Sequence, residues 1–165
     1  MSDQAQTNPP GKETDPLSVA AGGIDTTMPL LQSDRTMRLE CISSKVEPTK
    51  TDESRNVLTI VCKTTTDGVF TTGKPARAGY KLYKRISVSP SEPKDGKDGR
   101  TMDAIKRDLA LLLKAFFGAS TTKTPRELLN NPAMLEGLPV DARINIEIGT
   151  GGFPDKNGVS FIVPA

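Results

Sequence analysis

Residues 79–88 read GYKLYKRISV, and this stretch decides how the rest of the chain is interpreted. One parity of the stretch is mostly apolar and holds Tyr80, Leu82, Ile86 and Val88. The other parity holds Lys81, Tyr83, Arg85 and Ser87. Because successive side chains of a strand point to opposite faces, this alternation predicts a half-buried strand. Lys81, Tyr83 and Arg85 should then project together from its exposed face.

Two further strands are predicted before this one. In 37–41 the apolar residues Met37, Leu39 and Cys41 alternate with polar ones, and 58–63 repeats the pattern through Leu58, Ile60 and Cys62. Such period-2 patterns are typical of strands with one face in the core. The link between the two strands, 47–55, is polar throughout and is expected to lie at the surface.

Helical spacing replaces the period of two after residue 100. Thr101 can cap a helix that has Asp103 in its first turn, and apolar residues recur every three or four positions up to Gly118. Thr124, Pro125 and Glu127 form a capping-box pattern with proline at the first helical position, which predicts a short second helix. Pro132 should end or kink that second helix.

Two more alternating runs follow, 142–148 and 159–163, separated by a glycine-rich turn. The predicted class is therefore mainly β with α (α+β), in the order β-β-β-α-β-β. Five short strands with a helix between the third and the fourth are the element order of an OB-fold, a small and partly open barrel that binds oligonucleotides or oligosaccharides. We expect an OB-fold-like barrel over residues 24–165.

Residues 1–23 have a different composition. They hold three prolines and three glycines among polar residues, which favours a disordered N-terminal arm. Charge divides in the same way: residues 1–35 carry two cations against five carboxylates, a net −3, and residues 36–165 carry 20 cations against 15 carboxylates, a net +5. An acidic arm attached to a basic body is predicted, and the arm could compete for the basic surface.

Composition argues against an enzyme. The chain has no histidine, which removes Ser-His-Asp and Cys-His nucleophilic pairs and histidine metal sites. Cys41 and Cys62 are too few for a structural zinc site, and they share the apolar parity of neighbouring strands, so buried reduced thiols are expected. Neither 71–75 nor 149–152 has the spacing and the following helix of a nucleotide-binding loop. We expect no catalytic residues, no cofactor and no metal.

The segment 68–91 contains no acidic residue, and it combines cations with aromatic side chains. Single-stranded nucleic acid needs both, because cations track the phosphates and bases stack on flat rings. The candidate nucleic-acid-binding residues are Lys74, Arg77, Lys81, Tyr83, Lys84 and Arg85. A solvated strand and loop without a ligand is the alternative reading of the same charges.

Four segments carry a family resemblance: 24–31 (IDTTMPLL), 79–83 (GYKLY), 104–117 and 128–148. Together they resemble bacteriophage OB-fold single-stranded DNA-binding proteins, or uncharacterised phage relatives, over residues 24–165. The resemblance implies protection of single-stranded DNA in phage replication or recombination, without catalytic residues. Many such proteins end in an acidic tail with a terminal aromatic, whereas this chain ends FIVPA. Recruitment of partners through that end is therefore not expected.

The sequence thus predicts a non-enzymatic single-stranded DNA-binding protein. The alternative is a structural or assembly protein of a virion, with a β-rich body and an extended arm. No run approaches the roughly 20 apolar residues of a membrane span, and the polar start lacks a signal peptide. We expect a cytoplasmic protein of the phage-infected bacterial host cell. A homodimer or higher self-assembly is expected, since small open barrels often shield their edges by pairing.

Overall fold

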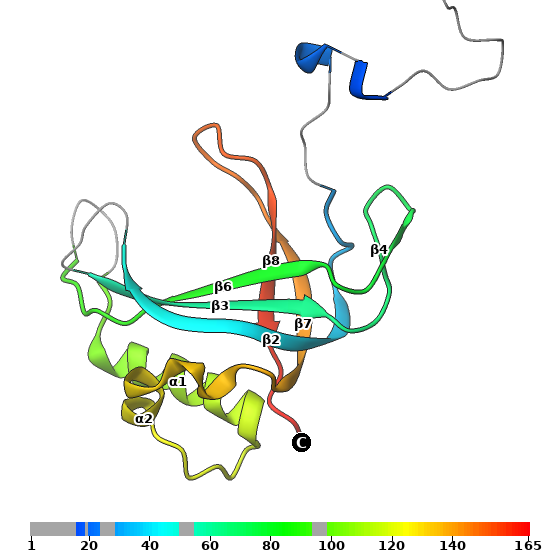
Figure 1. Ribbon diagram of the computed structural model, residues 1–165. Coiled ribbons are helices and arrows are strands. Elements are labelled where there is room, and N and C mark those ends of the chain that lie inside the picture. The colour runs from blue at the N-terminus through cyan, green and yellow to red at the C-terminus, as the bar shows by residue number, and fades with distance from the viewer. Residues whose placement is uncertain (1–15, 19, 24–28, 50–54, 94–98) are drawn as a thin grey trace, which may run out of the picture.

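The computed structural model describes residues 16–18, 20–23, 29–49, 55–93 and 99–165. Five strands form one antiparallel sheet in the order β6-β3-β2-β7-β8 (Figure 1). Their bounds are β2 Arg35–Pro48, β3 Asn56–Thr64, β6 Lys81–Ser87, β7 Pro139–Glu147 and β8 Lys156–Phe161. The α+β class and the helix between the third and fourth of these strands are confirmed.

Strand β2 is the centre of this sheet because it pairs with two neighbours. Arg35 to Glu40 pair with β7, and Leu39 to Pro48 pair with β3. A β-bulge between Cys41 and Ser43 follows the last residue that pairs with β7, and beyond it β2 pairs with β3 alone. Beside it, the Cys41 N–H donates to Leu138 O at 3.0 Å and Gly137 N–H donates to Cys41 O at 2.7 Å, so β2 leaves β7 at this point. A bulge bends a strand and increases its twist, which lets one strand serve both halves of the sheet.

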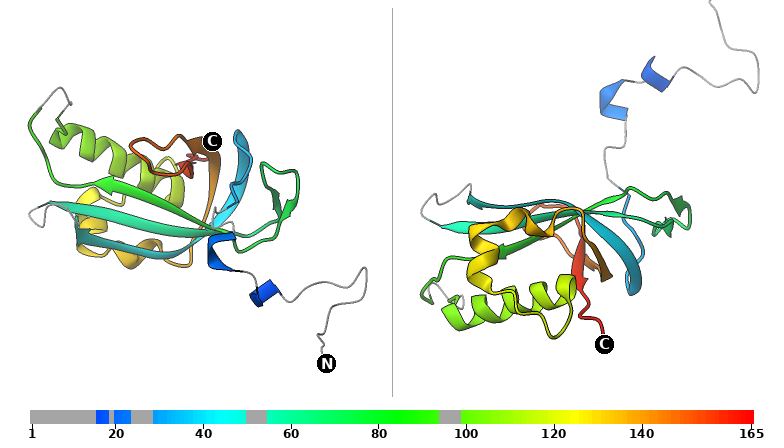
Figure 2. Two further views of the ribbon diagram at one scale, coloured as in Figure 1. Left: turned by 90° about the horizontal axis from the view of Figure 1, so that it is seen from above. Right: turned by 60° about the horizontal axis from the view of Figure 1, so that its bottom comes forward.

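The sheet and two helices share one core. Helix α1 (Met102–Phe117) and helix α2 (Pro125–Asn130) lie on the same side of the sheet (Figure 2). Leu39, Ile60 and Ile144 on the strands are fully buried together with Leu109 of α1. Thr101 accepts the Ala104 N–H at α1, and the capping box of Thr124 and Glu127 is present at α2, as predicted. The second helix ends before Pro132, where the 3-10 turn η3 (Pro132–Leu135) begins.

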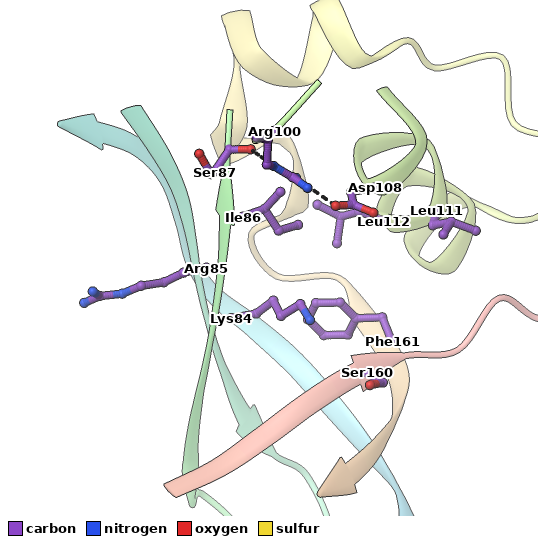
Figure 3. Close-up of a pocket in the computed structure, with 10 residues that line it drawn as sticks. All are labelled: Lys84, Arg85, Ile86, Ser87, Arg100, Asp108, Leu111, Leu112, Ser160 and Phe161. Carbon is purple, nitrogen blue, oxygen red and sulfur yellow. Dashed lines mark hydrogen bonds and ion pairs between the residues drawn. The ribbon is translucent and has the colours of Figure 1, made fainter. Parts of the chain in front are cut away.

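Strands β6 and β8 are the two edges of the sheet, and the expected closure into a barrel is not seen among the described residues. Parts of β6 and β8 lie with their Cα atoms within 8 Å of each other, and a cavity between the two strands is lined by residues of β6, β8 and α1 (Figure 3). β8 also differs from its prediction, because it begins at Lys156 and ends at Phe161 instead of continuing to Val163. The observed architecture is therefore an open five-stranded antiparallel sheet with helices on one face.

The sequence did not predict a small second hairpin between β3 and β6. Its strands are β4 (Gly68–Val69) and β5 (Pro75–Ala76), and it lies at the end of the sheet from which β6 starts (Figure 1). Of the predicted N-terminal arm, only the single turns η1 (Pro16–Ser18) and η2 (Ala21–Gly23) and Ala20 are described. The rest of the arm lies outside the described residues, so its disorder stays a prediction. No helix in the described part of the chain is long and apolar enough to cross a membrane.

Shortening a fully buried side chain of β2 should test the role of this strand. Leu39 is completely buried, so Leu39→Ala removes its packing and leaves a cavity, at a cost of about 2–5 kcal/mol of unfolding free energy. Leu111 on α1 is half exposed, and Leu111→Ala is the matched control with a cost of about 1 kcal/mol or less. Urea denaturation followed by circular dichroism measures both; equal losses would contradict the assignment of β2 to the core.

Candidate nucleic-acid interface

The side of the sheet opposite the helices presents residues of β3 and β6 in three cross-strand pairs. The pairs are Lys63 with Lys81, Val61 with Tyr83, and Thr59 with Arg85. We name these six residues the β3–β6 face. Side chains directly opposite on one face of a sheet have Cβ atoms about 5 Å apart, so each pair is in contact range. The predicted grouping of Lys81, Tyr83 and Arg85 on one side of β6 is confirmed by the burial pattern, in which Leu82 and Ile86 are buried.

Positive charge exceeds negative charge on this face, although Glu40 of β2 lies opposite Lys63 on the other side of β3. Lys63 and Lys81 lie opposite each other, and neither forms an ion pair with any described residue; the same holds for Arg85. Two cations of the neighbouring strand β2 are paired with carboxylates: Arg38 with Asp141 at 3.0 Å and Lys45 with Glu47 at 3.6 Å. Like charges directly opposite destabilise a sheet, so the face is built at a cost that a bound anion would relieve.

Carboxylates border the face on the β2 side. Glu40 is the β2 neighbour of Lys63, and Glu47 accepts a hydrogen bond from the Thr59 hydroxyl at 3.2 Å. Lys45, the β2 neighbour of Thr59, lies 3.6 Å from Glu47 and is thereby partly neutralised. The positive strip therefore follows β3 and β6 rather than β2.

Tyr83 lies in the middle of the face. Tyr83 is 56% exposed, and its cross-strand partner Val61 is apolar and partly buried. An exposed ring between Lys81 and Arg85 offers a flat surface for a base while the cations reach phosphates on either side. A flat ring between two cations is the combination that single-stranded nucleic acid requires.

The other predicted residues lie elsewhere. Lys84 shares the parity of Leu82 and Ile86 and lines the cavity on the opposite side of β6, so it does not join the β3–β6 face. Lys74 and Arg77 are exposed on and beside the β4–β5 hairpin. No cross-strand pairing of the sheet includes either of them, so they flank the face instead of forming it.

Sequence reasoning missed Lys63. Its place in the alternation of 58–63 put it on the exposed parity of its strand, but only the register with β6 places it opposite Lys81. Lys45 was missed as well, because the bulge after Cys41 shifts the parity of β2 and brings Lys45 beside Thr59.

Tyr80 anchors the start of β6. Its hydroxyl donates to Pro29 O at 2.7 Å, and its ring packs edge-on against Phe70 with centroids 5.8 Å apart. Burial raises the pKa of this phenol above its ordinary value. The expected core role of Tyr80 is thus confirmed in part, since the residue is partly buried and packs against the core. Because Tyr80 packs against the core, the alternation of side chains turns Leu82 toward the core as well and turns Lys81 and Tyr83 to the opposite face.

The two cysteines lie opposite each other on β2 and β3, and both are buried and free. The hydrogen bond to Cys41, together with burial, raises the pKa of Cys62, so this thiol stays protonated at neutral pH. Both cysteines are therefore buried and reduced in the structure, as expected from the sequence. The described residues contain no group of three or more side chains that could hold a metal ion.

Comparison with protein-family models, with curated proteins and with solved structures found no match to this chain. The candidate interface consequently rests on the geometry and the charge of the β3–β6 face alone.

Reversing one charge of the opposed lysine pair should stabilise the protein. Lys81→Glu replaces a repulsive pair with an attractive one, and the unfolding free energy should rise by about 0.2–1 kcal/mol. Lys74→Glu removes the same charge at an exposed site outside the sheet, so it controls for the change in net charge. Thermal melts at low salt measure both. A loss of stability in Lys81→Glu, or an equal gain in Lys74→Glu, would show that Lys63 and Lys81 do not repel each other.

Proposed function

We propose that this protein binds single-stranded DNA, without catalysis, through the β3–β6 face. The observation that carries the proposal is the opposed pair of Lys63 and Lys81 next to the exposed ring of Tyr83. Glu40 is the β2 neighbour of Lys63, but neither lysine forms an ion pair with a described residue, and like charges directly opposite destabilise a sheet. A phosphate backbone supplies the missing negative charge, and Tyr83 supplies a stacking surface for one base.

The arrangement of the sheet supports an OB-type fold for this function. When the five strands are numbered in chain order, their order across the sheet is third, second, first, fourth and fifth. Helix α1 lies between the third and the fourth strand in the sequence. An OB-fold is a partly open barrel that binds oligonucleotides on the face of its second and third strands. These strands correspond to β3 and β6, which carry the candidate face. We propose an OB-fold that is open between β6 and β8.

Single-strand binding gives the protein a place in DNA replication or recombination, where single strands are exposed. The resemblance of 24–31, 79–83, 104–117 and 128–148 to phage single-stranded DNA-binding proteins supports a role in a bacteriophage. In this role the protein coats the strand and leaves the chemistry to other proteins.

Fluorescence anisotropy of a labelled oligo-dT and of its duplex tests the proposal. The single strand should bind more tightly, and three neutralised phosphates should give a slope of about −2 for log affinity against log salt. Tyr83→Ala should cost about 1–3 kcal/mol of binding free energy through the lost stack, whereas Tyr83→Phe, which keeps the ring, should bind like the parent protein.

The cations of the face are tested in the same titration. Lys63→Ala should weaken binding and reduce the magnitude of the salt slope by about 0.7, the share of one phosphate in a single strand. Lys106→Ala, an exposed lysine on α1, is the matched control and should bind nearly as the parent protein does. Absence of binding at low salt, or equal effects of the two lysine variants, would remove the proposal.

A second candidate function is self-assembly, as in a virion component. The observation in its favour is the β7–β8 loop, where Ile148 is 74% and Phe153 77% exposed. Light scattering after size-exclusion chromatography should then show an oligomer that Ile148→Ser with Phe153→Ser dissociates. A monomer at micromolar concentration would leave DNA binding as the sole proposal.

A further inference from the structure

Cys41 and Cys62 are the two cysteines of the chain, and they lie directly opposite each other on β2 and β3. Cys41 is 0% and Cys62 is 2% exposed, and both thiols are free. They share the core-facing parity of Leu39 and Ile60, so their side chains point away from the β3–β6 face. We name them the β2–β3 cysteine pair, and the proposed DNA interface does not use it.

The backbone pattern makes this a non-hydrogen-bonded pair of the ladder. The Cys41 N–H donates to Leu138 O and the Cys41 carbonyl accepts the Gly137 N–H, so both groups point away from β3. On β3, the Thr64 N–H donates toward β6, and the register of these two strands has no shift. Cys62 has the same parity and therefore directs its backbone groups away from β2. In an antiparallel sheet the Cα atoms of such a pair are about 4.5 Å apart, and the side chains are closer than in a hydrogen-bonded pair.

This spacing meets the requirement of a disulfide bond. The Cα atoms of bonded cysteines are usually about 4.4–6.8 Å apart. A non-hydrogen-bonded pair lies within that range, so Cys41 and Cys62 can be joined without a change of register. The pair also lies at the short end of the range, where strain makes a disulfide easier to reduce.

The two thiols differ in their readiness to react. A hydrogen bond from Cys62 lowers the pKa of Cys41, against the opposing effects of burial and of the carboxylates Glu136 and Glu40. The same hydrogen bond, together with burial, raises the pKa of Cys62. Cys41 is therefore the member of the pair that forms a thiolate, which is the nucleophilic form, and Cys62 keeps its proton.

We propose that the β2–β3 cysteine pair is a reversible redox site that closes into a disulfide when the protein meets a peroxide. Hydrogen peroxide transfers one oxygen to the Cys41 thiolate, which becomes a sulfenic acid, and hydroxide is released. The Cys62 thiol then condenses with the sulfenic acid, so that the S–S bond forms and water leaves with the Cys62 proton. The two sulfurs together lose two electrons, which reduce the O–O bond of the peroxide.

The β-bulge beside Cys41 favours entry of a small oxidant. Ile42 lies within the bulge and has no cross-strand partner in the described ladders, so the sheet is interrupted next to the pair. Backbone with fewer hydrogen bonds opens locally at a lower cost than the rest of a sheet. Hydrogen peroxide should therefore react faster with the folded protein than oxidised glutathione, a much larger oxidant.

The disulfide would lock β2 to β3 and leave the DNA interface unchanged. It restricts the unfolded chain by closing the segment 42–61 into a loop, so the oxidised protein should unfold at a higher urea concentration. Lys63 follows Cys62 directly, but its side chain lies on the opposite face of β3. Oligo-dT should consequently bind the oxidised and the reduced protein equally, whether or not the proposed function holds.

Mass spectrometry and thiol titration of the full-length protein, treated with hydrogen peroxide without denaturant, test the proposal. The parent protein should lose two hydrogens and both titratable thiols, remain a single chain on a non-reducing gel, and recover both thiols with dithiothreitol. Cys62→Ala should instead gain oxygen at Cys41, and Cys41→Ala should leave Cys62 largely unmodified. Circular dichroism confirms that each variant is folded before treatment.

Three results would overturn the proposal. The first is a parent protein that keeps both thiols or gains oxygen without losing two hydrogens. The second is a disulfide between two chains, which would appear as a dimer on the gel. The third is an oxidised protein with the same urea midpoint as the reduced one, which would show that the bond does not lock β2 to β3.

Discussion

The structure depends on one constraint: β2 must pair with β7 through its first half and with β3 along most of its length. The bulge between Cys41 and Ser43 makes this possible, because it bends the strand where its partner β7 ends. Cys41 N–H donates to Leu138 O, Gly137 N–H donates to Cys41 O, and the Glu136 side chain accepts the Ser44 N–H at 3.0 Å, so these bonds hold the bend. Strand β2 thereby joins β3 and β6 to β7 and β8 in one sheet.

Two surfaces of opposite character follow from that geometry, and both belong to β6. Its odd-numbered side chains Lys81, Tyr83 and Arg85 are exposed on the β3–β6 face. Its even-numbered side chains Leu82 and Ile86 are buried in the core, and Lys84, which has the same parity, lines the cavity between β6 and β8. The opposed pair Lys63 and Lys81 is a feature that does not favour the stability of the sheet.

The sequence predicted the parts of this structure that depend on local patterns. Alternation predicted the five strands, and capping residues predicted both helices, because these signals lie within a few residues of one another. The sequence could not predict features that depend on register: the opposition of Lys63 to Lys81, the parity shift at Ser43 and the cavity between β6 and β8 all need long-range pairing. Lys84 shows the same limit, since its parity was visible but the cavity that receives it was not. The β4–β5 hairpin was missed because its strands have only two residues each and no period.

Chemical-shift mapping with isotope-labelled protein and unlabelled oligo-dT tests the central claim most directly, since it reports on all assigned backbone amides in one experiment. The account predicts that the largest shifts occur at the three cross-strand pairs of the β3–β6 face, with Tyr83 foremost, and that α1 and α2 remain unchanged. Shifts confined to the helices or to the β4–β5 hairpin, or no shifts at low salt, would contradict a nucleic-acid interface on β3 and β6.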